Sequence, residues 1–535
     1  MPETPGEWRR PGPAPTMGRT GRDGPLGPAP TRAERRRPMG KGLVSFLPRP
    51  LSLGFWLGLV LFAGGLLVPA TPDFPPVQRN ALALALLMGA WWMTEALPLG
   101  VTALLPLALY PFLGIMTTKE VSPRYADHLV FLFMGGFLVA LAMQEWNLHK
   151  RIALHTIALM GAGPRKLLFG FMAATAFLSM WISNTATTIM ILPIGLGVIR
   201  KIQGEGEGKE PGDFHYGTIL MLGIAYSASI GGIATLVGTP PNLVFSGVFA
   251  RFFPHLPEVT FARWFLLVAP LTAVFFAALF LFLAFGLLRR RDLPSLPGKE
   301  YLAKELESLG PLSGPEKRVL FVFVLTALLW IFRADIRAGS FVIPGWAGLL
   351  GLQGKVQDST VAVAMGILLF LLPAGRGRGD RPILRLRALL DLPWDILLLF
   401  GGGFALAEGI QKTGLAATIG RQLTFLGHLH PFFLLLVVAL VLAFLTEFTS
   451  NTAVATTMLP ILAGLSRDLH LDPMILMVPA TVAASCAFLL PVATPPNAIV
   501  FGTRYIPIGK MVRVGLVLEF LFALLAAAYF TAVLF

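Results

Sequence analysis

The chain has 535 residues, of which 55% are hydrophobic and only 13% are charged, and its formal net charge is +14. A soluble domain usually carries about 25% charged residues, so this composition excludes an ordinary soluble protein. The positive charges lie between apolar segments of roughly 20 residues, so they indicate membrane orientation, and we expect no nucleic-acid partner.

Two further classes of chemistry are excluded. The single cysteine, Cys486, leaves no intrachain disulfide and no cysteine-ligated metal site. The sequence has no phosphate-binding loop, no zinc-protease motif and no nucleophile elbow, so we expect neither ATP hydrolysis nor enzyme activity. Any uphill transport would therefore draw on an ion gradient, and we expect no bound cofactor.

The chain begins with a segment, residues 1–50, that is rich in Pro, Gly and Arg. Such a composition cannot bury a core, so we interpret it as a disordered basic cytoplasmic tail. Met1, Met17 and Met39 are alternative start sites, which N-terminal sequencing would distinguish.

The rest of the chain predicts an all-α polytopic membrane protein, because backbone amides in lipid must find partners within their own segment. We expect eleven spanning helices, near 51–69, 77–97, 98–116, 127–147, 217–250, 264–288, 318–334, 359–373, 393–411, 474–503 and 511–534. Two apolar stretches, 167–199 and 431–465, are too long for one crossing and are broken by polar residues at their middle. We interpret them as re-entrant hairpins that enter and leave on the same side of the membrane.

This arrangement places most of the basic loop residues on one side of the membrane. The positive-inside rule then predicts a multi-pass protein of the cytoplasmic (inner) membrane, with the N-terminus in the cytoplasm and the C-terminus outside. The rule is satisfied only if neither hairpin crosses, which supports the count of eleven.

Two diverged copies of one pattern run through the chain. The matching segments are LFMGGFLVALAMQ at 132–144 with LFGGGFALAEGIQ at 399–411, SNTATTIMILPI at 183–194 with SNTAVATTMLPI at 450–461, and GTPPNLVF at 238–245 with ATPPNAIV at 493–500. Each copy holds five crossings and one hairpin, and an odd number of crossings inverts the second copy relative to the first. Inverted repeats place their binding sites near the membrane midplane, where interrupted helices meet.

The repeats also set the expected domain boundaries. The first helix of the chain lies outside them. We expect the tail at 1–50, an extra first helix at 51–76, a first inverted repeat at 77–290, a cytoplasmic linker at 291–317 and a second inverted repeat at 318–535.

The repeated motifs supply both kinds of ligand that an anion and a cation need. Ser-Asn-Thr begins at Ser183 and Ser450, at the hairpin tips, and Thr-Pro-Pro-Asn begins at Thr239 and Thr494, inside helices. Consecutive prolines cannot continue a helix, so nearby carbonyl oxygens are freed, and such oxygens suit a small hard cation. The half-helices that start after each break present free N–H groups and a positive dipole end, which suit a carboxylate.

The charge distribution sharpens this prediction. Segments 167–199, 217–250 and 474–503 contain no Lys, Arg, Asp or Glu, and segment 431–465 contains only Glu447. A dianion among these segments would meet no basic side chain, and burying its charge uncompensated is costly. Bound cations are the available neutraliser, so we expect obligatory ion coupling.

Other interpretations remain open on the residues alone. The motifs could be helix breaks packed in protein, because Ser and Thr also join membrane helices, although four matched breaks favour a site. We expect Glu95 and Glu145 to reach the membrane interface, whereas Glu408 and Glu447 are candidates for proton or ion coupling. We also expect His149 to lie at the interface.

The paired Ser-Asn-Thr motifs, the paired Thr-Pro-Pro-Asn motifs and the LF-x-G-G-F segments resemble the divalent anion/sodium symporter family, which includes bacterial sodium-dependent dicarboxylate transporters. The resemblance covers nearly everything after residue 50. It implies a homodimer whose protomers have a scaffold domain and a transport domain that moves like an elevator. It also implies that the amphipathic stretches 148–164 and 412–428 are arms that join the two domains.

The resemblance implies particular site residues as well. The first sodium site corresponds to Ser179, Ser183, Asn184 and the carbonyl of Gly238, and the second to Thr446, Ser450, Asn451 and the carbonyl of Ala493. The substrate carboxylates correspond to Ser183, Asn184, Thr185, Ser450, Asn451, Thr452 and Thr494, with Thr239 added by symmetry.

The expected function is sodium-coupled symport of C4-dicarboxylates such as succinate, malate or fumarate. Both Ser-Asn-Thr motifs are intact, and the resemblance associates that pattern with dicarboxylates. The alternatives are the same fold carrying sulfate, citrate or another oxyanion, or coupled to protons. A membrane-embedded enzyme is a remote alternative, because no His or Asp accompanies the Ser and Thr residues of the motifs.

Overall fold

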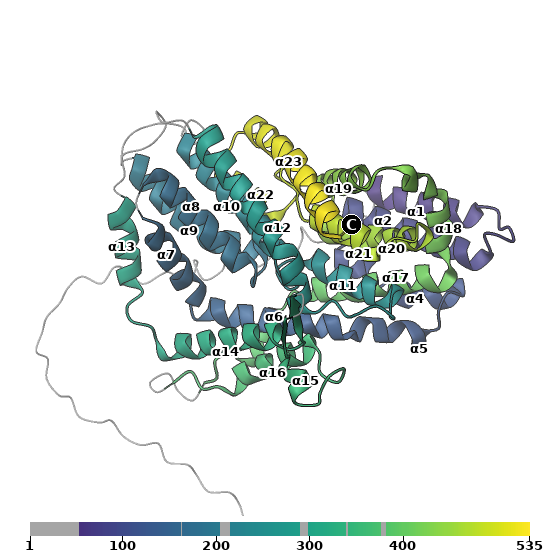
Figure 1. The fold of residues 1–535 in the computed structure, drawn as a ribbon, viewed down its shortest axis with the longest axis horizontal. Helices are drawn as coiled ribbons and strands as arrows, with labels where there is room; N and C mark the ends of the chain where they lie inside the picture. Colours follow the sequence, from purple (N-terminus) through teal and green to yellow (C-terminus); the bar gives the residue numbers. More distant parts are fainter. Residues whose placement is uncertain are drawn as a thin grey trace, which may run out of the picture. The chain divides into compact units, whose positions relative to one another are not determined.

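The computed structural model describes residues 53–161, 163–203, 215–288, 298–338, 341–375 and 381–534. The predicted tail at 1–50, the first residues of the expected span 51–69 and part of the expected linker 291–317 lie outside the described residues. Within the described residues the chain is almost entirely helical (Figure 1).

The first half of the chain folds into helices close to the expected spans. They are α1 (Leu53–Leu67), α2 (Pro76–Thr94), α3 (Leu99–Thr102), α4 (Leu105–Leu113), α5 (Thr118–Val121), η2 (Ser122–Ala126), α6 (His128–Glu145), α7 (Leu148–Met160), α8 (Pro164–Ser179), α9 (Asn184–Gln203), α10 (His215–Ile233), α11 (Pro240–Phe252), α12 (Phe261–Leu281) and η4 (Phe282–Leu287). The expected single span 98–116 is divided into α3 and α4. Pro106, in the first turn of α4, has no N–H with which to continue α3.

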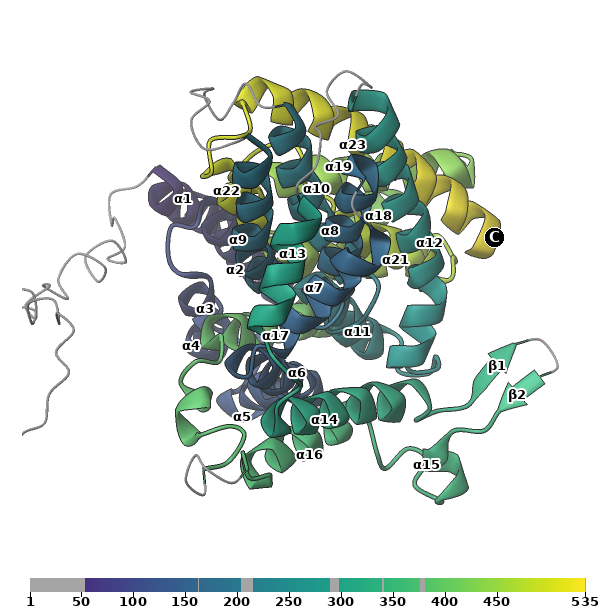
Figure 2. The same cartoon turned by 90° about the vertical axis from the view of Figure 1, so that its left-hand side faces the viewer.

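The second half repeats this order. Its elements are α13 (Gly298–Ser308), α14 (Gly314–Ile331), β1 (Ile336–Ala338), β2 (Phe341–Ile343), α15 (Trp346–Leu349), α16 (Asp358–Leu371), η6 (Leu386–Leu389), α17 (Trp394–Thr413), α18 (Leu415–Gln422), η7 (Thr424–His428), α19 (Pro431–Phe448), α20 (Asn451–Asp468), α21 (Pro473–Ala483), α22 (Pro495–Phe501) and α23 (Ile508–Leu534). The strands β1 and β2 form an antiparallel pair in register Ile336↔Ile343, and this hairpin was not expected from the sequence (Figure 2).

The polar motifs coincide with real interruptions. Each expected hairpin consists of two helices that meet at the Ser-Asn-Thr motif, α8 with α9 and α19 with α20. The expected spans 217–250 and 474–503 are each divided in two, and α11 and α22 begin at the first proline of their Thr-Pro-Pro-Asn motifs. A proline at the first helical position loses nothing, because its missing N–H would have had no partner there.

Membrane length separates the helices into classes. Among the described residues, six helical stretches are by themselves long and apolar enough to cross a membrane: 118–145, 184–203, 215–233, 261–287, 431–448 and 508–534. The broken spans fall short individually, because each half carries only part of the roughly 30 Å hydrocarbon thickness. The expected count of eleven crossings and the re-entrant nature of the hairpins stay predictions.

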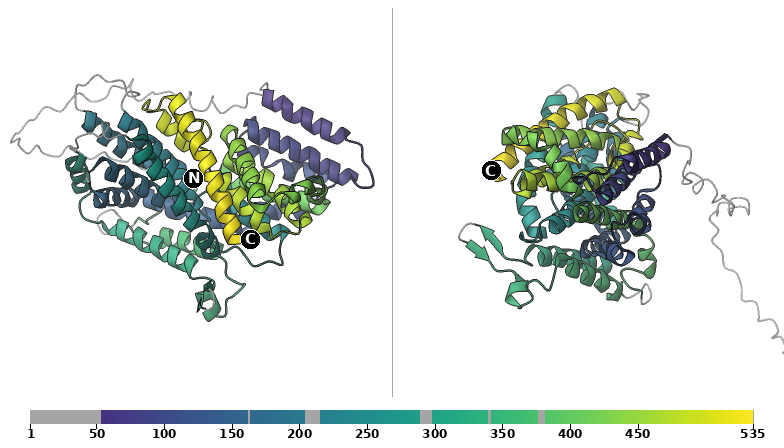
Figure 3. Two further views of the ribbon diagram at one scale, coloured as in Figure 1. Left: turned by 45° about the horizontal axis from the view of Figure 1, so that its top comes forward. Right: turned by 90° about the vertical axis from the view of Figure 1, so that its right-hand side faces the viewer.

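The helices pack in two groups. One, which we call the framework group, contains α1–α6, α14, α16 and α17, with α6 packed along α16 and α17 packed on α2 and α3. Figure 3 shows α1 beside α2 in this group. The other, which we call the hairpin group, contains α8–α12 and α19–α23. The expected arms coincide with α7 and with α18 and η7, and α7 packs on α8 while α18 packs on α20.

Two details of packing matter later. Residues Tyr216 to Ile233 of α10 are all buried, because α8, α9, α12 and α22 surround the helix. The His149 side chain in α7 is buried, and its Nδ1 lies 2.9 Å from the carbonyl oxygen of Met143. Its expected position at the membrane interface stays a prediction. Burial lowers the pKa of the His149 imidazole, so it stays neutral in the fold.

Candidate functional site

One cavity of about 700 Å³ lies where the four helix breaks meet. The hairpin group supplies the two tips and the two proline-containing breaks, and the framework group supplies the loop after α2, part of α6 and the start of α17. The lining residues that belong to the breaks are Ser183, Asn184, Thr185, Gly238, Thr239, Pro240, Ser450, Asn451, Thr452, Ala493, Thr494, Pro495 and Pro496. Tips that are 267 residues apart in sequence therefore share one space.

The structure brings most of the expected site residues to this cavity. Ten of them line it directly, and the remaining two, Ser179 and Thr446, are buried behind the tips. The Ser179 hydroxyl donates a hydrogen bond to Asn184 Oδ1 at 2.6 Å, and the Thr446 hydroxyl donates to Asn451 Oδ1 at 2.5 Å. The two halves thus orient their tip asparagines in the same way.

Helix starts converge on the same space. α9 begins at Asn184 and α20 begins at Asn451, whereas Thr239 and Thr494 precede the first turns of α11 and α22. The first turn of a helix presents backbone N–H groups without partners inside the helix, and it is the positive end of the helix dipole. The cavity therefore presents donors that suit carboxylate oxygens.

The asparagine of each Thr-Pro-Pro-Asn motif holds its break together. Asn242 Nδ2 donates to the carbonyl oxygens of Gly232, Ile233 and Thr235 at 3.2, 3.2 and 2.7 Å. Asn497 Nδ2 donates to the carbonyl oxygens of Ala487 and Leu490 at 3.2 and 3.1 Å. Both side chains are buried, so these asparagines satisfy carbonyls that the break has freed.

Oxygen atoms crowd around a glycine pair in the first half. A Cβ atom placed on Gly232 would lie 2.5 Å from Asn184 Oδ1 and 3.1 Å from the carbonyl oxygen of Gly238. A Cβ atom placed on Gly238 would lie 2.4 Å from the carbonyl oxygen of Gly232. Only glycine fits at either position, and the neighbouring oxygens are hard ligands of the kind that small cations prefer.

The side chains around the cavity carry negative charge and no positive charge. Among the described residues that line it, none is Lys, Arg or His, whereas Glu95 and Asp395 are both present. Glu95 has a left-handed backbone with φ of 47°, which is uncommon for a residue other than glycine. The wall is otherwise apolar and includes Phe133, Phe137 and Phe448.

Some of these residues were missed by the sequence analysis. The sequence favours a position at the membrane interface for Glu95, and it gives no signal for Asp395. Phe133 and Phe137 belong to the repeated LF-x-G-G-F segment, so the repeat itself was the signal that could have identified them.

A pair of buried acids lies behind the second tip. Glu447 in α19 and Glu519 in α23 are both buried, and the two helices pack on each other. The Glu447 carboxylate accepts hydrogen bonds from the backbone N–H groups of Phe488, Leu489 and Leu490 at 2.5, 2.8 and 2.9 Å. Glu519 was overlooked, although an acid within a long apolar helix is itself a signal.

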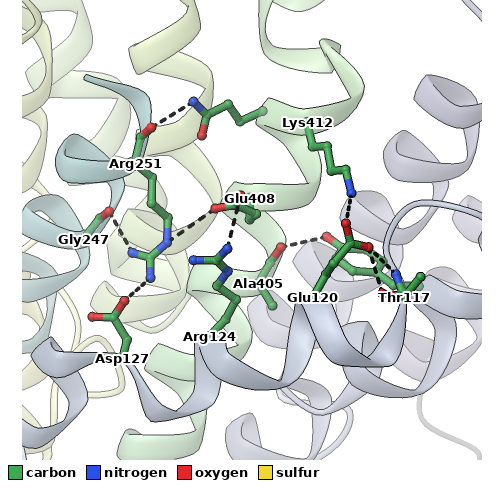
Figure 4. A network of polar contacts seen from close by, with 11 residues as sticks. Thr117, Glu120, Arg124, Asp127, Gly247, Arg251, Ala405, Glu408 and Lys412 are labelled. Carbon is green, nitrogen blue, oxygen red and sulfur yellow. Dashed lines mark hydrogen bonds and ion pairs between the residues drawn. The ribbon is translucent and has the colours of Figure 1, made fainter. Parts of the chain in front are cut away.

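A cluster of ion pairs joins the two groups of helices at the other end of α17 (Figure 4). We call it the arginine cluster, and it consists of Arg124, Asp127, Arg251 and Glu408. Arg251, at the end of α11, contacts the Asp127 carboxylate, and its Nε lies 3.8 Å from Glu408 Oε2. Arg124 lies 3.5 Å from Glu408 Oε1. The cluster therefore ties α11 of the hairpin group to η2, α6 and α17 of the framework group.

Packing and a flanking pair reinforce the arginine cluster. The Arg251 guanidinium lies 4.2 Å from the ring centre of Phe404, and its Nη1 donates to the carbonyl oxygen of Gly247 at 2.8 Å. Nearby, Lys412 Nζ donates to Glu120 Oε1 at 2.6 Å. Asp395 at the cavity and Glu408 in the cluster are 13 residues apart on α17, which corresponds to about 20 Å of helix.

Comparison with known proteins gives a consistent result. The family model described as "Sodium:sulfate symporter transmembrane region" matches residues 52–534. The chain is 41% identical over 466 residues to the sodium-dependent dicarboxylate transporter SdcS of Staphylococcus saprophyticus, covering 86% of this chain and 87% of that protein. It is 40% identical over 488 residues to SdcS of Staphylococcus aureus, covering 91% and 90%.

Two solved structures resemble the fold. The MtrF protein of Neisseria gonorrhoeae, described as illuminating a class of antimetabolite efflux pumps, superimposes with a TM-score of 0.56 at 14% identity over 91% of this chain and 96% of that one. The YdaH transporter of Alcanivorax borkumensis superimposes with a TM-score of 0.51 at 16% identity over 91% and 99%. At this identity the likeness concerns the fold alone, and that fold is an all-helical polytopic transporter.

Proposed function

The chain belongs to the sodium:sulfate symporter family, and on that premise we propose that it is a secondary active transporter which carries a C4-dicarboxylate together with sodium ions. It is a multi-pass membrane protein and not an enzyme. Its relatives at about 40% identity are sodium-dependent dicarboxylate transporters, which favours a diacid over sulfate as the cargo.

One observation supports the proposed coupling between sodium and the transported anion. The cavity gathers helix starts and backbone oxygens from both halves but has no basic side chain among the described residues that line it. A dicarboxylate there would bring two negative charges next to Glu95 and Asp395. Bound sodium ions offset this repulsion only when they are present, so loading of the anion depends on loading of the cations.

We assign roles to the lining residues on this basis. Around the first tip, Ser183, Asn184, Ser179 and the carbonyl of Gly238 would hold one sodium ion. Around the second tip, Ser450, Asn451, Thr446 and the carbonyl of Ala493 would hold another. The side chains proposed to contact the carboxylates are Ser183, Asn184, Thr185, Thr239, Ser450, Asn451, Thr452 and Thr494.

We further propose that the hairpin group is the transport domain and the framework group is the scaffold, as in an elevator. Sodium and substrate ligands come from the hairpin group, so they would move together with their cargo. The arginine cluster supports this division, because it is a set of polar contacts between the groups that a sliding motion would break. The arms α7 and α18 would connect the two domains.

The proposed setting is the cytoplasmic membrane, with the N-terminus inside and the C-terminus outside, and the proposed assembly is a homodimer. On that topology the start of α17 and the loop after α2 face the cytoplasm, and the arginine cluster lies near the outer surface. The cavity would then be the inward-facing site, closed on the outer side by the cluster.

Succinate uptake into proteoliposomes tests the function. We expect uptake driven by an inward sodium gradient, and we expect it to vanish when choline replaces sodium at fixed pH. Competition by unlabelled malate and fumarate should be strong, and competition by sulfate and citrate weak. Unchanged uptake in choline would remove sodium coupling, and strong competition by sulfate would instead favour an oxyanion carrier.

A further inference from the structure

The break between α21 and α22 is held by a carboxylate that the break between α10 and α11 lacks. Glu447 is fully buried and accepts three backbone hydrogen bonds, from Phe488, Leu489 and Leu490. The residue 267 positions earlier, at the matching place in the first repeat, is Met180. An ionisable side chain within a membrane segment is costly, and such residues usually serve function.

The two breaks differ accordingly in length and in how they are fixed. Residues 484–494 separate α21 from α22, whereas only residues 234–239 separate α10 from α11. In the shorter break, the Thr235 hydroxyl donates to the carbonyl oxygen of Met180 at 2.5 Å. The longer break leaves more N–H groups without helical partners, and Glu447 takes up three of them.

This carboxylate lies directly behind the cavity. Phe488, Leu489 and Leu490 precede Ala493 and Thr494, which line the cavity. Thr446, next to Glu447, lies 2.5 Å from Asn451 Oδ1 and 3.1 Å from the carbonyl oxygen of Ala484, where the break begins. The tip of α19 is therefore attached to the start and to the middle of the broken segment.

The neighbouring buried acid makes no such connection. Glu519, in α23, is also buried, but its carboxyl group accepts no backbone hydrogen bond among those of the described residues. Glu447 instead holds three backbone N–H groups of the break and lies one residue from Thr446, a proposed sodium ligand.

We propose that Glu447 is a positioning residue for the second cation site: its three backbone hydrogen bonds fix residues 488–490 and so place the segment that leads to Ala493 and Thr494. The inference rests on the proposed sodium-coupled transport. It makes the two sodium sites unequal, because the first depends on a glycine pair and the second on a carboxylate. Losing Glu447 should weaken sodium binding before it weakens the maximal rate.

The test is the sodium dependence of succinate uptake by purified protein in proteoliposomes. We expect Glu447→Gln to raise the sodium concentration for half-maximal uptake about tenfold, because an amide has a single acceptor oxygen and cannot hold all three N–H groups. The maximal rate at saturating sodium should fall much less. Glu519→Gln is the matched control, since it makes the same substitution at a neighbouring buried acid that holds no part of the break, and its sodium curve should lie within about twofold of the unmodified protein.

A second variant and a second readout cover the possibility that Glu447→Gln folds poorly. Glu447→Asp keeps both carboxyl oxygens on a side chain that is shorter by one methylene group. It should shift the sodium curve by a smaller factor than Glu447→Gln. Sodium-induced thermal stabilisation of the detergent-solubilised protein reports binding without transport, and it should shift in parallel.

Three outcomes distinguish the ideas. A sodium curve that is unchanged in the Glu447 variants, with only less folded or slower protein, would show a purely structural role and overturn the inference. A larger shift in Glu519→Gln than in Glu447→Gln would show that Glu519 and not Glu447 positions the site, and it would also overturn the inference. If the unmodified protein and Glu519→Gln both transport succinate without sodium, the proposed function itself fails.

Discussion

The two ends of α17 differ in whether basic side chains balance their acidic ones. At its start, Asp395 lines a cavity that has no basic side chain among the described residues. Near its other end, Glu408 belongs to a cluster in which Arg124 and Arg251 balance two carboxylates. The same helix thus runs from an unbalanced negative site to a balanced one.

The difference shows what each site has to do. A fixed arginine forms a lasting contact, which suits a joint between two groups of helices. The same residue in the cavity would bind a dicarboxylate and then hinder its release. In the proposed mechanism, mobile cations would leave together with the anion, so they would neutralise it without retaining it. The comparison therefore predicts two different effects. A fixed positive charge placed in the cavity should slow transport, whereas loss of positive charge from the arginine cluster should lower stability.

The largest effect should come from the tip asparagines, which we propose as ligands of both sodium ions and the substrate. Asn184→Ala and Asn451→Ala should each reduce sodium-driven succinate uptake at least about a hundredfold, because each loses contacts with charged species. Initial rates in proteoliposomes measure this. Asn80→Ala, in α2 and outside the cavity, should keep a rate close to that of the unmodified protein. Normal rates in both tip variants would refute the site assignment.

The next largest effect should come from a fixed positive charge in the cavity, of the kind that Arg124 and Arg251 supply in the arginine cluster. Val492 lines the cavity and is 82% exposed, so Val492→Arg should fold. We expect succinate to stabilise this variant thermally even without sodium, and we expect uptake about tenfold slower, because a nearby opposite charge retains the dianion. Sodium-dependent stabilisation like that of the unmodified protein would contradict the contrast between the two ends.

The third effect removes the cation from the cluster. Arg251→Gln leaves Asp127 without its partner in a largely buried site, which should lower stability by about 3 kcal/mol. Thermal unfolding in detergent should show this as a lower midpoint. Adding Asp127→Asn should restore much of the loss, because no unpaired charge then remains. Equal stability of the single variant and the unmodified protein would mean that the arginine cluster does not hold the two groups of helices together.

The smallest effect concerns the acids at the cavity wall. Asp395→Asn should lower the KM for succinate by roughly twofold at low ionic strength, because one repulsive charge is removed. Added choline chloride should abolish the difference, since salt screens charges that water can reach. A change in KM that persists at high salt would indicate direct contact with the substrate instead.

Much of the candidate site could be predicted because its signals are local. Polar tripeptides in the middle of apolar stretches and consecutive prolines interrupt helices wherever they occur. Their repetition, at a spacing of 267 residues for Ser-Asn-Thr and 255 for Thr-Pro-Pro-Asn, indicates which interruptions belong together. The structure accordingly brings Asn184 and Asn451 to one cavity, and it divides both spans that contain Thr-Pro-Pro-Asn.

The missed features depend on which distant segments become neighbours. Arg251 forms ion pairs with Asp127 and Glu408, which come from two other segments of the chain. No pattern within any one segment predicts these pairs. Glu95 reaches the cavity only because the loop after α2 packs near the hairpin tips. Pro106 is a local signal for the division of span 98–116, but the length of this apolar stretch favours a single helix.

The burial of α10 has a mechanical consequence. A helix enclosed on all sides by α8, α9, α12 and α22 cannot slip past any of them without opening voids, and close-packed interiors resist such shear. In the proposed elevator motion, the bundle around α10 would therefore move as a rigid block. Bending would then fall on the connectors, and Gly161 and Gly414, at the ends of α7 and α17, have positive φ angles that such hinges can use.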